Sequence, residues 1–284
     1  MLHPAAPPRL AHARLLPALL AVLLLLPLAV RAAERAELLP LIVDGRLTGL
    51  VWLEGDGPRA YAVKYAAWNG EGWEAPQTIA PPGPGSQLAL TAARLADGSW
   101  LLAWSAFDGH DDEIVWSRLQ GGAWSRPQRV AADNDVPDIT PALTRAGSAA
   151  LLAWSRFEAG EYRLVVSRFV RGAWTPPQPV APPGSFFPTF AAAPADSSGR
   201  ARVLYRTAAP SGWALLELDG AGRPLRRAAV SGLPGAAMKA RPVVADEAGS
   251  VTFRWPAAAA GAADTVRGAD WERADIGDGA ERRP

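Results

Sequence analysis

Short apolar stretches alternate with polar, glycine-containing turns along most of this chain. In a representative stretch, segments of this kind cover residues 88–95, 99–107, 114–119 and 123–131. Asp97-Gly98 and Gly121-Gly122 supply two of the turns between them, and the polar run 108–113 supplies the third. Strand-length segments rich in β-branched and aromatic residues, bounded by such turns, are typical of successive hairpins. The pattern therefore predicts an all-β chain.

The four-strand pattern recurs along the sequence. Residues 101–131 align without a gap onto residues 151–181, with about half of the positions identical and a period of roughly 50 residues. A large aromatic residue marks the second strand of five successive units: Trp52, Trp104, Trp154, Tyr205 and Trp255. Four-stranded units at this period predict a β-propeller, with five four-stranded blades as the first choice. A six-bladed or imperfectly closed ring is the alternative, because the fifth unit lacks a clear fourth strand.

The periodic aromatic residues are expected to hold neighbouring sheets together. The second strands are apolar on both faces, as in the LLAW segments at 101–104 and 151–154, which is the pattern of a sheet covered on both sides. Trp73, Trp124 and Trp174 mark the start of the fourth strand in three units. Stacking of sugars on these rings is the other interpretation, but a periodic aromatic residue is more often part of the core.

The ends of the chain differ from the repeats. Residues 1–32 have a basic start and an apolar run of roughly 16 residues, which predicts a signal peptide cleaved after Ala32. An uncleaved membrane anchor is the alternative. Residues 33–276 are expected to form one propeller domain, and residues 277–284 a polar tail. The expected location is therefore periplasmic or secreted.

Composition excludes several classes of function. The net charge is +1 with scattered basic residues, which argues against nucleic-acid binding. The chain has no cysteine, so neither disulfides nor thiolate chemistry can operate. Of three histidines, only His110 lies outside the predicted leader. A zinc site rich in histidine, or a Ser-His-Asp triad on another histidine, is thereby excluded.

The turn before the fourth strand resembles a known repeat. The segment SRLQGGAW, residues 117–124, resembles the bacterial neuraminidase repeat, or Asp-box, with the pattern Ser-x-Asp-x-Gly-x-x-Trp. Ser117, Gly121 and Trp124 match that pattern, and Leu119 stands where the Asp belongs. In the next unit Ser167 and Trp174 match. The resemblance implies a sialidase-like propeller in which the box is a structural turn away from the catalytic centre.

The same resemblance implies what a sialidase would need. Sialidases bind the substrate carboxylate with three arginines and use an Asp acid/base with a Tyr-Glu nucleophile pair. The Phe-Arg-Ile-Pro motif that carries the first arginine is absent. Arg156, Arg206, Arg241 and Arg254 supply guanidinium groups outside any matching motif. This departure argues against a sialidase.

Two acidic loops are predicted to share one face of the propeller, where functional loops usually gather. They are DGHDDE, residues 108–113, and DNDVPD, residues 133–138. Three interpretations remain: solvated loops, a calcium site, or a carboxylate pair for glycoside cleavage. The calcium site would use Asp108, Asp111, Asp133 and Asp135. The catalytic pair would use Asp138 with Asp111 or Asp112.

The wider candidate site covers more of this face. The residues expected to bind a ligand are Asp108, Asp135, Asp138, Phe186, Phe187, Lys239 and Arg241. The preferred function is a non-catalytic, exported propeller that binds a glycan or a protein partner in the cell envelope. The alternatives are a sialidase-like glycoside hydrolase and an envelope assembly or scaffold factor. No cofactor other than calcium is expected.

Overall fold

The computed structural model describes most of the repeat region. It covers residues 34–55, 57, 59, 61–182, 184, 186–194, 199–208, 210–230, 243–247, 250–256 and 271–274. Side chains are described between residues 36 and 230, apart from residue 187. Every regular element in this part is a strand, and none of its segments is a helix long and apolar enough to cross a membrane. The predicted signal peptide and polar tail lie outside the described residues.

Three antiparallel sheets are formed by the first three units. The first contains β1 (Glu34–Val43), β2 (Arg46–Gly55), β3 (Ala62–Ala67) and β4 (Gln77–Ala80). The second contains β5 (Gln87–Arg94), β6 (Trp100–Phe107), β7 (Asp112–Gln120), β8 (Ala123–Trp124) and β9 (Gln128–Arg129). The third contains β10 (Asp138–Ala146), β11 (Ala149–Glu158), β12 (Glu161–Val170), β13 (Ala173–Trp174) and β14 (Gln178–Pro179).

Two further sheets follow. The fourth contains β15 (Phe186–Pro194), β16 (Ala201–Thr207), β17 (Gly212–Leu218) and β18 (Pro224–Val230). The fifth contains β19 (Val243–Glu247), β20 (Ser250–Pro256) and β21 (Trp271–Ala274). Each unit is a meander of sequential antiparallel hairpins, as the turn spacing predicts.

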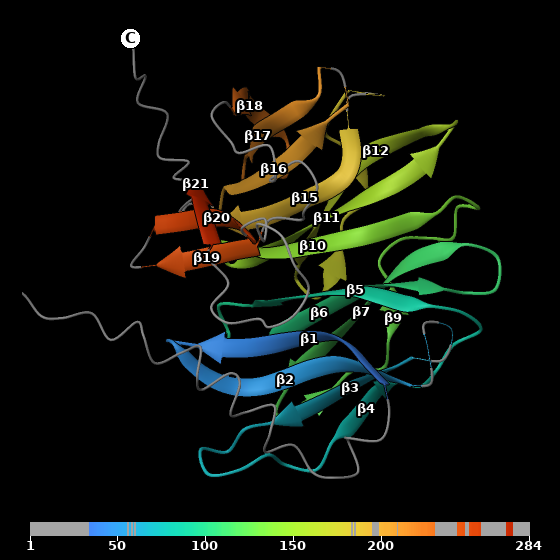
Figure 1. Cartoon of the computed structure of the whole chain (residues 1–284), viewed down its shortest axis with the longest axis vertical. Coiled ribbons are helices and arrows are strands. Elements are labelled where there is room, and N and C mark those ends of the chain that lie inside the picture. Colours follow the sequence, from blue (N-terminus) through green and yellow to red (C-terminus); the bar gives the residue numbers. More distant parts are fainter. Residues whose placement is uncertain are drawn as a thin grey trace, which may run out of the picture.

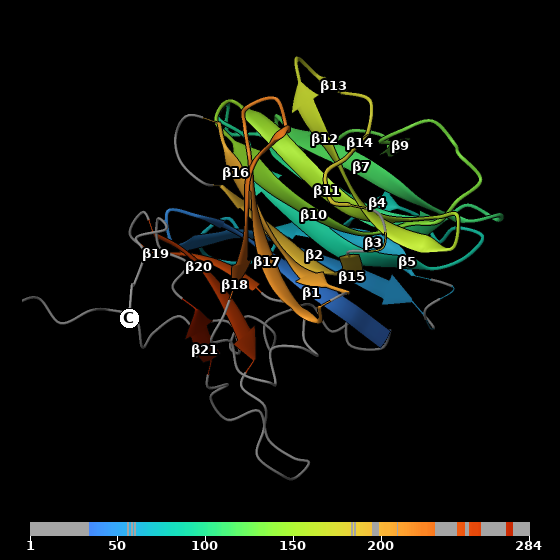
Figure 2. The same ribbon diagram turned by 90° about the horizontal axis from the view of Figure 1, so that it is seen from above.

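The sheets are arranged as in a β-propeller. The first strand of each sheet contacts the first strand of the next: β1 with β5, β5 with β10, β10 with β15, and β15 with β19. Figure 1 shows the sheets succeeding one another in chain order, and Figure 2 shows β19–β21 beside the fourth sheet. The all-β propeller fold is thus confirmed. The fifth sheet has three strands in the described part, so the number of blades and the closure of the ring remain predictions.

The aromatic residues of the second strands lie between neighbouring sheets, as expected. Trp104 packs in the core between the first and second sheets, Trp154 between the second and third, and Tyr205 between the third and fourth. All three are 0% exposed. In the fourth strands, Trp124 contacts Tyr65 of the preceding sheet edge to face at 5.4 Å. The rings of Trp104, Trp154 and Tyr205 therefore lie inside the sheet interfaces. Trp52 instead packs with Leu50 and Ala66 of its own sheet, and the side chain of Trp255 lies outside the described residues.

The fourth strands differ from the expectation of one continuous segment. In the second sheet this strand is divided into β8 and β9, and Pro127 lies in the gap. Proline has no N–H to donate to the ladder, so pairing stops there. Ser117, the matching serine of the Asp-box pattern, donates a hydrogen bond to the carbonyl of Ser125 at 2.7 Å and closes this gap. Ser167 does the same toward Thr175 at 2.6 Å in the third sheet.

The innermost strands carry bulges that join one sheet to the next. Glu37, Ala89 and Thr140 have positive φ at register shifts in β1, β5 and β10. The Glu37 carboxylate accepts the N–H groups of Ala89 and Leu90 at 2.8 and 2.7 Å. Backbone N–H groups freed by the bulge in β5 are thereby satisfied by the preceding sheet.

Candidate functional site

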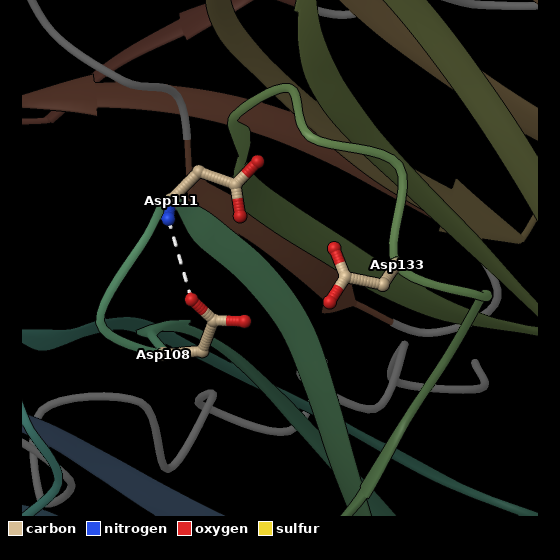
Figure 3. A group of neighbouring side chains, drawn as sticks. All are labelled: Asp108, Asp111 and Asp133. Atoms are coloured by element: carbon tan, nitrogen blue, oxygen red, sulfur yellow. Dashed lines mark hydrogen bonds between the residues drawn. The ribbon is translucent and has the colours of Figure 1, made fainter.

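The two acidic loops meet, as predicted. The β6–β7 turn supplies Asp108 and Asp111, and the segment between β9 and β10 supplies Asp133. One carboxylate oxygen from each of these residues lies within 4.8 Å of the others. Figure 3 shows the three side chains, which we call the acidic trio, grouped between the two loops. Residues about 25 positions apart in sequence therefore form one cluster.

Local hydrogen bonds fix two members of the acidic trio. Asp108 Oδ1 accepts the N–H groups of His110 and Asp111 at 2.9 and 3.3 Å, which shapes the turn. Arg129 donates to Oδ2 of both Asp108 and Asp133, in the second case at 2.7 Å. The N–H of His110, with further help from that of Asp111 and from the Arg129 charge, holds the pKa of Asp108 below its usual value despite some burial.

Asp111 is the exception within the acidic trio. It is 7% exposed, and neither of its carboxylate oxygens has a hydrogen-bond partner among the described residues. Burial, and then the charges of Asp108 and Asp133, raise its pKa. A buried carboxylate without a partner is costly, so its surroundings favour either a proton or a cation.

Asp138, the first residue of β10, is held by a bidentate ion pair. Arg156 Nε and Nη2 each lie 2.8 Å from a different Asp138 oxygen, and Asn134 Nδ2 donates to Oδ2 at 3.2 Å. Asp138 is 1% exposed. Its hydrogen bonds raise the pKa of Arg156. Two parallel N–H···O bonds from one guanidinium are the geometry of a charge-assisted ion pair, which holds the Asp138 carboxylate in place.

The repeat explains why this pair is unusual. Asp138 opposes Arg156 in the third sheet as Gln87 opposes Ala106 in the second, one repeat earlier. Gln87 accepts the indole N–H of Trp104 at 2.9 Å. The corresponding indole N–H of Trp154 has no partner in the described part of the chain. The third sheet thus has an ion pair at the position where the second sheet has a neutral hydrogen bond to the indole.

Glu113 is the residue that sequence reasoning missed. It opposes Ala106 in the β6–β7 hairpin, is 1% exposed, and its Oε1 has no hydrogen-bond partner in the described residues. Burial, and then the negative charges of Asp138 and Asp111, raise its pKa to about 7. The aligned position in the next unit is Arg163, a partly exposed charge, so the repeat gave no sign that Glu113 is buried. We call Glu113 and Asp138 the buried carboxyl pair.

The other predicted residues are not part of this centre. Asp112 is partly buried, and burial followed by the Asp111 charge raises its pKa. Asp135 is 87% exposed and its closest ionic neighbour is His110 at 3.9 Å. Phe186 is 3% exposed in the core beside Phe190, so we do not assign it a ligand. The side chain of Phe187, and all of Lys239 and Arg241, lie outside the described residues.

The pKa of Glu113 predicts a pH dependence of stability. Its folded-state pKa of about 7 is above the ordinary 4.5, so the native state holds this proton more tightly than the unfolded chain does. The contribution is complete below about pH 4.5 and is lost as pH rises through 7, a total of about 3 kcal/mol. Glu113→Gln, which mimics the protonated form, should match the natural protein at low pH and exceed it in unfolding free energy at about pH 8.

Urea unfolding in EDTA between about pH 4.5 and pH 8 checks this difference. The Asp111 and Asp112 carboxyls titrate in both proteins, so the difference between the two unfolding free energies at each pH isolates the contribution of Glu113. Parallel stability curves for the two proteins would show that Glu113 is not a buried acid of raised pKa.

Comparison with known proteins supports the fold and little more. No protein-family model matches the chain, and no curated protein matches it by sequence. An α-L-arabinofuranosidase from Lactobacillus brevis is similar in structure, with a TM-score of 0.51, 11% identity, and coverage of 82% of this chain and 86% of that one. A protein of unknown function from Dyadobacter fermentans has a TM-score of 0.50 at 11% identity, with coverage of 79% of this chain and 80% of that one. A glycosyl hydrolase from Bacteroides ovatus has a TM-score of 0.49 at 10% identity, with coverage of 80% of this chain and 82% of that one.

These findings correct the preferred functional expectation. The non-catalytic binding propeller is not upheld as the main interpretation: the structures similar to this chain include glycoside hydrolases such as the arabinofuranosidase, and a glycoside hydrolase was the alternative. The degenerate Asp-boxes, the absence of sialidase arginine motifs and the near absence of histidine had favoured binding over catalysis. Neither absence bears on cleavage by two carboxyl groups, which needs only an acid and a second carboxylate.

Proposed function

We propose that the protein is a glycoside hydrolase that acts through the buried carboxyl pair. The observation that carries this proposal is the contrast between two adjacent carboxyl groups in the fold. Asp138 is fixed as an anion by Arg156 at 2.8 Å, whereas Glu113 is buried with an unpartnered oxygen. Two carboxyl groups held in environments this different suit different roles, one as the proton donor and the other as the base or nucleophile.

The two roles follow from these environments. Glu113 donates a proton to the glycosidic oxygen as the bond to the leaving group breaks. Asp138 remains ionised and either attacks the anomeric carbon or activates the attacking water, and the separation of the carboxyl groups around the bound sugar decides which. Arg156 positions Asp138 and preserves its charge. Proton transfer of this kind contributes roughly 10²- to 10⁴-fold to the rate.

Access to the pair requires movement of a loop. Both carboxyl groups are 1% exposed, and Asn134 on the segment before β10 donates to Asp138. This segment is secured by Arg129 at Asp133 and by the carbonyl of Pro137, which accepts the N–H of Phe157 at 2.9 Å. We propose that a substrate displaces Asn134 and replaces its hydrogen bond, so that water is excluded while the bond is cleaved.

The finer family and the location are part of the same proposal. The retained Asp-box serines, Ser117 and Ser167, support a sialidase-like propeller through the turns that they close. The missing arginine motif favours a neutral glycan over a sialoside as substrate. The leader-like residues 1–32 support action in the periplasm or outside the cell, where glycans of the envelope are the expected partners.

A panel of 4-nitrophenyl glycosides of common pentoses, hexoses and sialic acid tests the proposal. We expect hydrolysis of at least one neutral glycoside, and Asp138→Asn should lower that rate at least 100-fold. Glu161→Gln removes an exposed carboxylate from the corresponding turn of the third sheet and should retain the rate. Hydrolysis that survives in Asp138→Asn, or its absence across the panel and a matching oligosaccharide set, would overturn the proposal.

A further inference from the structure

We infer that Asp108, Asp111 and Asp133 bind one calcium ion that joins the β6–β7 turn to the segment between the second and third sheets. This inference goes beyond the proposed hydrolase activity and does not depend on it. Two separate observations support the site: the grouping of the three carboxylates, and the condition of Asp111.

The grouping has the dimensions of a calcium site. One oxygen from each carboxylate lies within 4.8 Å of the other two. Ligands at 2.3–2.6 Å on opposite sides of one ion are about 5 Å apart, so one ion reaches all three without rearrangement of the loops. The three side chains offer carboxylate oxygens, which suit a hard cation, and an irregular trio completed by water suits calcium better than the octahedral magnesium ion.

Asp111 points to a ligand independently of this grouping. Both of its oxygens are buried and have no hydrogen-bond partner among the described residues, although the residue is 7% exposed. In Figure 3 its carboxylate is directed into the space that it shares with Asp108 and Asp133. A buried carboxylate requires a compensating charge or hydrogen bonds, and an ion at this position supplies the charge.

Arg129 does not satisfy the cluster by itself. It donates to Oδ2 of Asp108 and Oδ2 of Asp133 but makes no hydrogen bond to Asp111 among the described residues. With all three carboxylates ionised, the arginine leaves two negative charges, which one divalent cation neutralises. The Asp108 and Asp133 oxygens can accept a guanidinium hydrogen and a cation together, since each has two lone pairs.

Asp135 distinguishes a calcium site of defined ligands from a general effect of the negative charge of the loop. It belongs to the same segment as Asp133 and was expected among the calcium ligands. The structure instead places it 87% exposed, with His110 at 3.9 Å and outside the acidic trio. Asp135→Asn therefore changes the charge of the loop without removing a ligand, which makes it the matched control for Asp111→Asn.

Calorimetric titration of the EDTA-stripped protein with calcium chloride tests the inference. We expect one ion per chain, at least tenfold weaker binding in Asp111→Asn and Asp133→Asn, and less than a threefold change in Asp135→Asn. At about 100 times the Kd of the natural protein, calcium should raise its melting temperature by roughly 5–10 °C and raise that of Asp111→Asn by no more than about half as much.

The variants are suited to this test. Asp111→Asn removes a buried unpaired charge, so in EDTA it should be at least as stable as the natural protein and remain folded. No saturable binding up to about 5 mM calcium, or equal binding by Asp111→Asn, would overturn the inference. No substrate is present in either measurement, so a failure here leaves the hydrolase proposal standing, and the reverse also holds.

Discussion

Replacement of Trp154 by alanine is expected to lower the free energy of unfolding by about 3–5 kcal/mol. Trp154 is 0% exposed and packs in the core between the second and third sheets with Leu101 and Phe169. Removal of the indole leaves a cavity between two sheets whose backbones are fixed by their own ladders, so the site cannot collapse fully. Trp104 and Tyr205 occupy the comparable positions at the two neighbouring interfaces, and the loss measures how much one interface contributes.

The measurement is urea unfolding followed by far-ultraviolet circular dichroism. Phe157→Ala, in the same strand, is the control, because Phe157 is 38% exposed and should cost about 1 kcal/mol or less. Trp154→Phe retains part of the packing and should lie between the two, which keeps the prediction testable if the alanine variant does not fold. Equal unfolding midpoints for Trp154→Ala and Phe157→Ala would show that the indole is not part of a sheet interface.

The fold could be predicted from the sequence because the same pattern of strands and turns recurs in each unit. The four-strand period, with an aromatic residue in the second strand of each unit, predicts the packing between sheets. Trp104 and Trp154 lie in the sheet interfaces, where this pattern places them. The division of the fourth strand at Pro127 could also have been inferred, since proline cannot donate to a ladder. The bulge at Ala89 could not, because its donors are satisfied by Glu37, a residue one whole sheet earlier.

The site could be predicted only in part. Carboxylates in neighbouring loops were expected to meet, and Asp108, Asp111 and Asp133 do. Charged residues in a polar loop are expected to face solvent, however, so the sequence gave no reason to distinguish the buried Glu113 from the other acidic residues of its loop. The pairing of Asp138 with Arg156 depends on register across two strands, which one sequence does not state.

Loss of the Glu113 carboxyl is expected to reduce hydrolysis of unactivated glycosides by roughly 10²- to 10⁴-fold. An alkoxide is a poor leaving group, so cleavage of its glycoside depends on a proton delivered as the bond breaks. A 2,4-dinitrophenolate leaves without that proton. Glu113→Gln retains the size and the polarity of the side chain and removes the acid, and the low-pH stability of this variant is expected to equal that of the natural protein.

The most direct measurement is the rate of Glu113→Gln on two glycosides of one sugar, with a methyl and a 2,4-dinitrophenyl leaving group. The sugar is the one that the 4-nitrophenyl panel identifies. If Glu113 is the acid, the variant loses at least 100-fold on the methyl glycoside and less than about tenfold on the dinitrophenyl glycoside. Equal losses on both glycosides, or no loss on either, would contradict the assignment of this buried carboxyl as the proton donor.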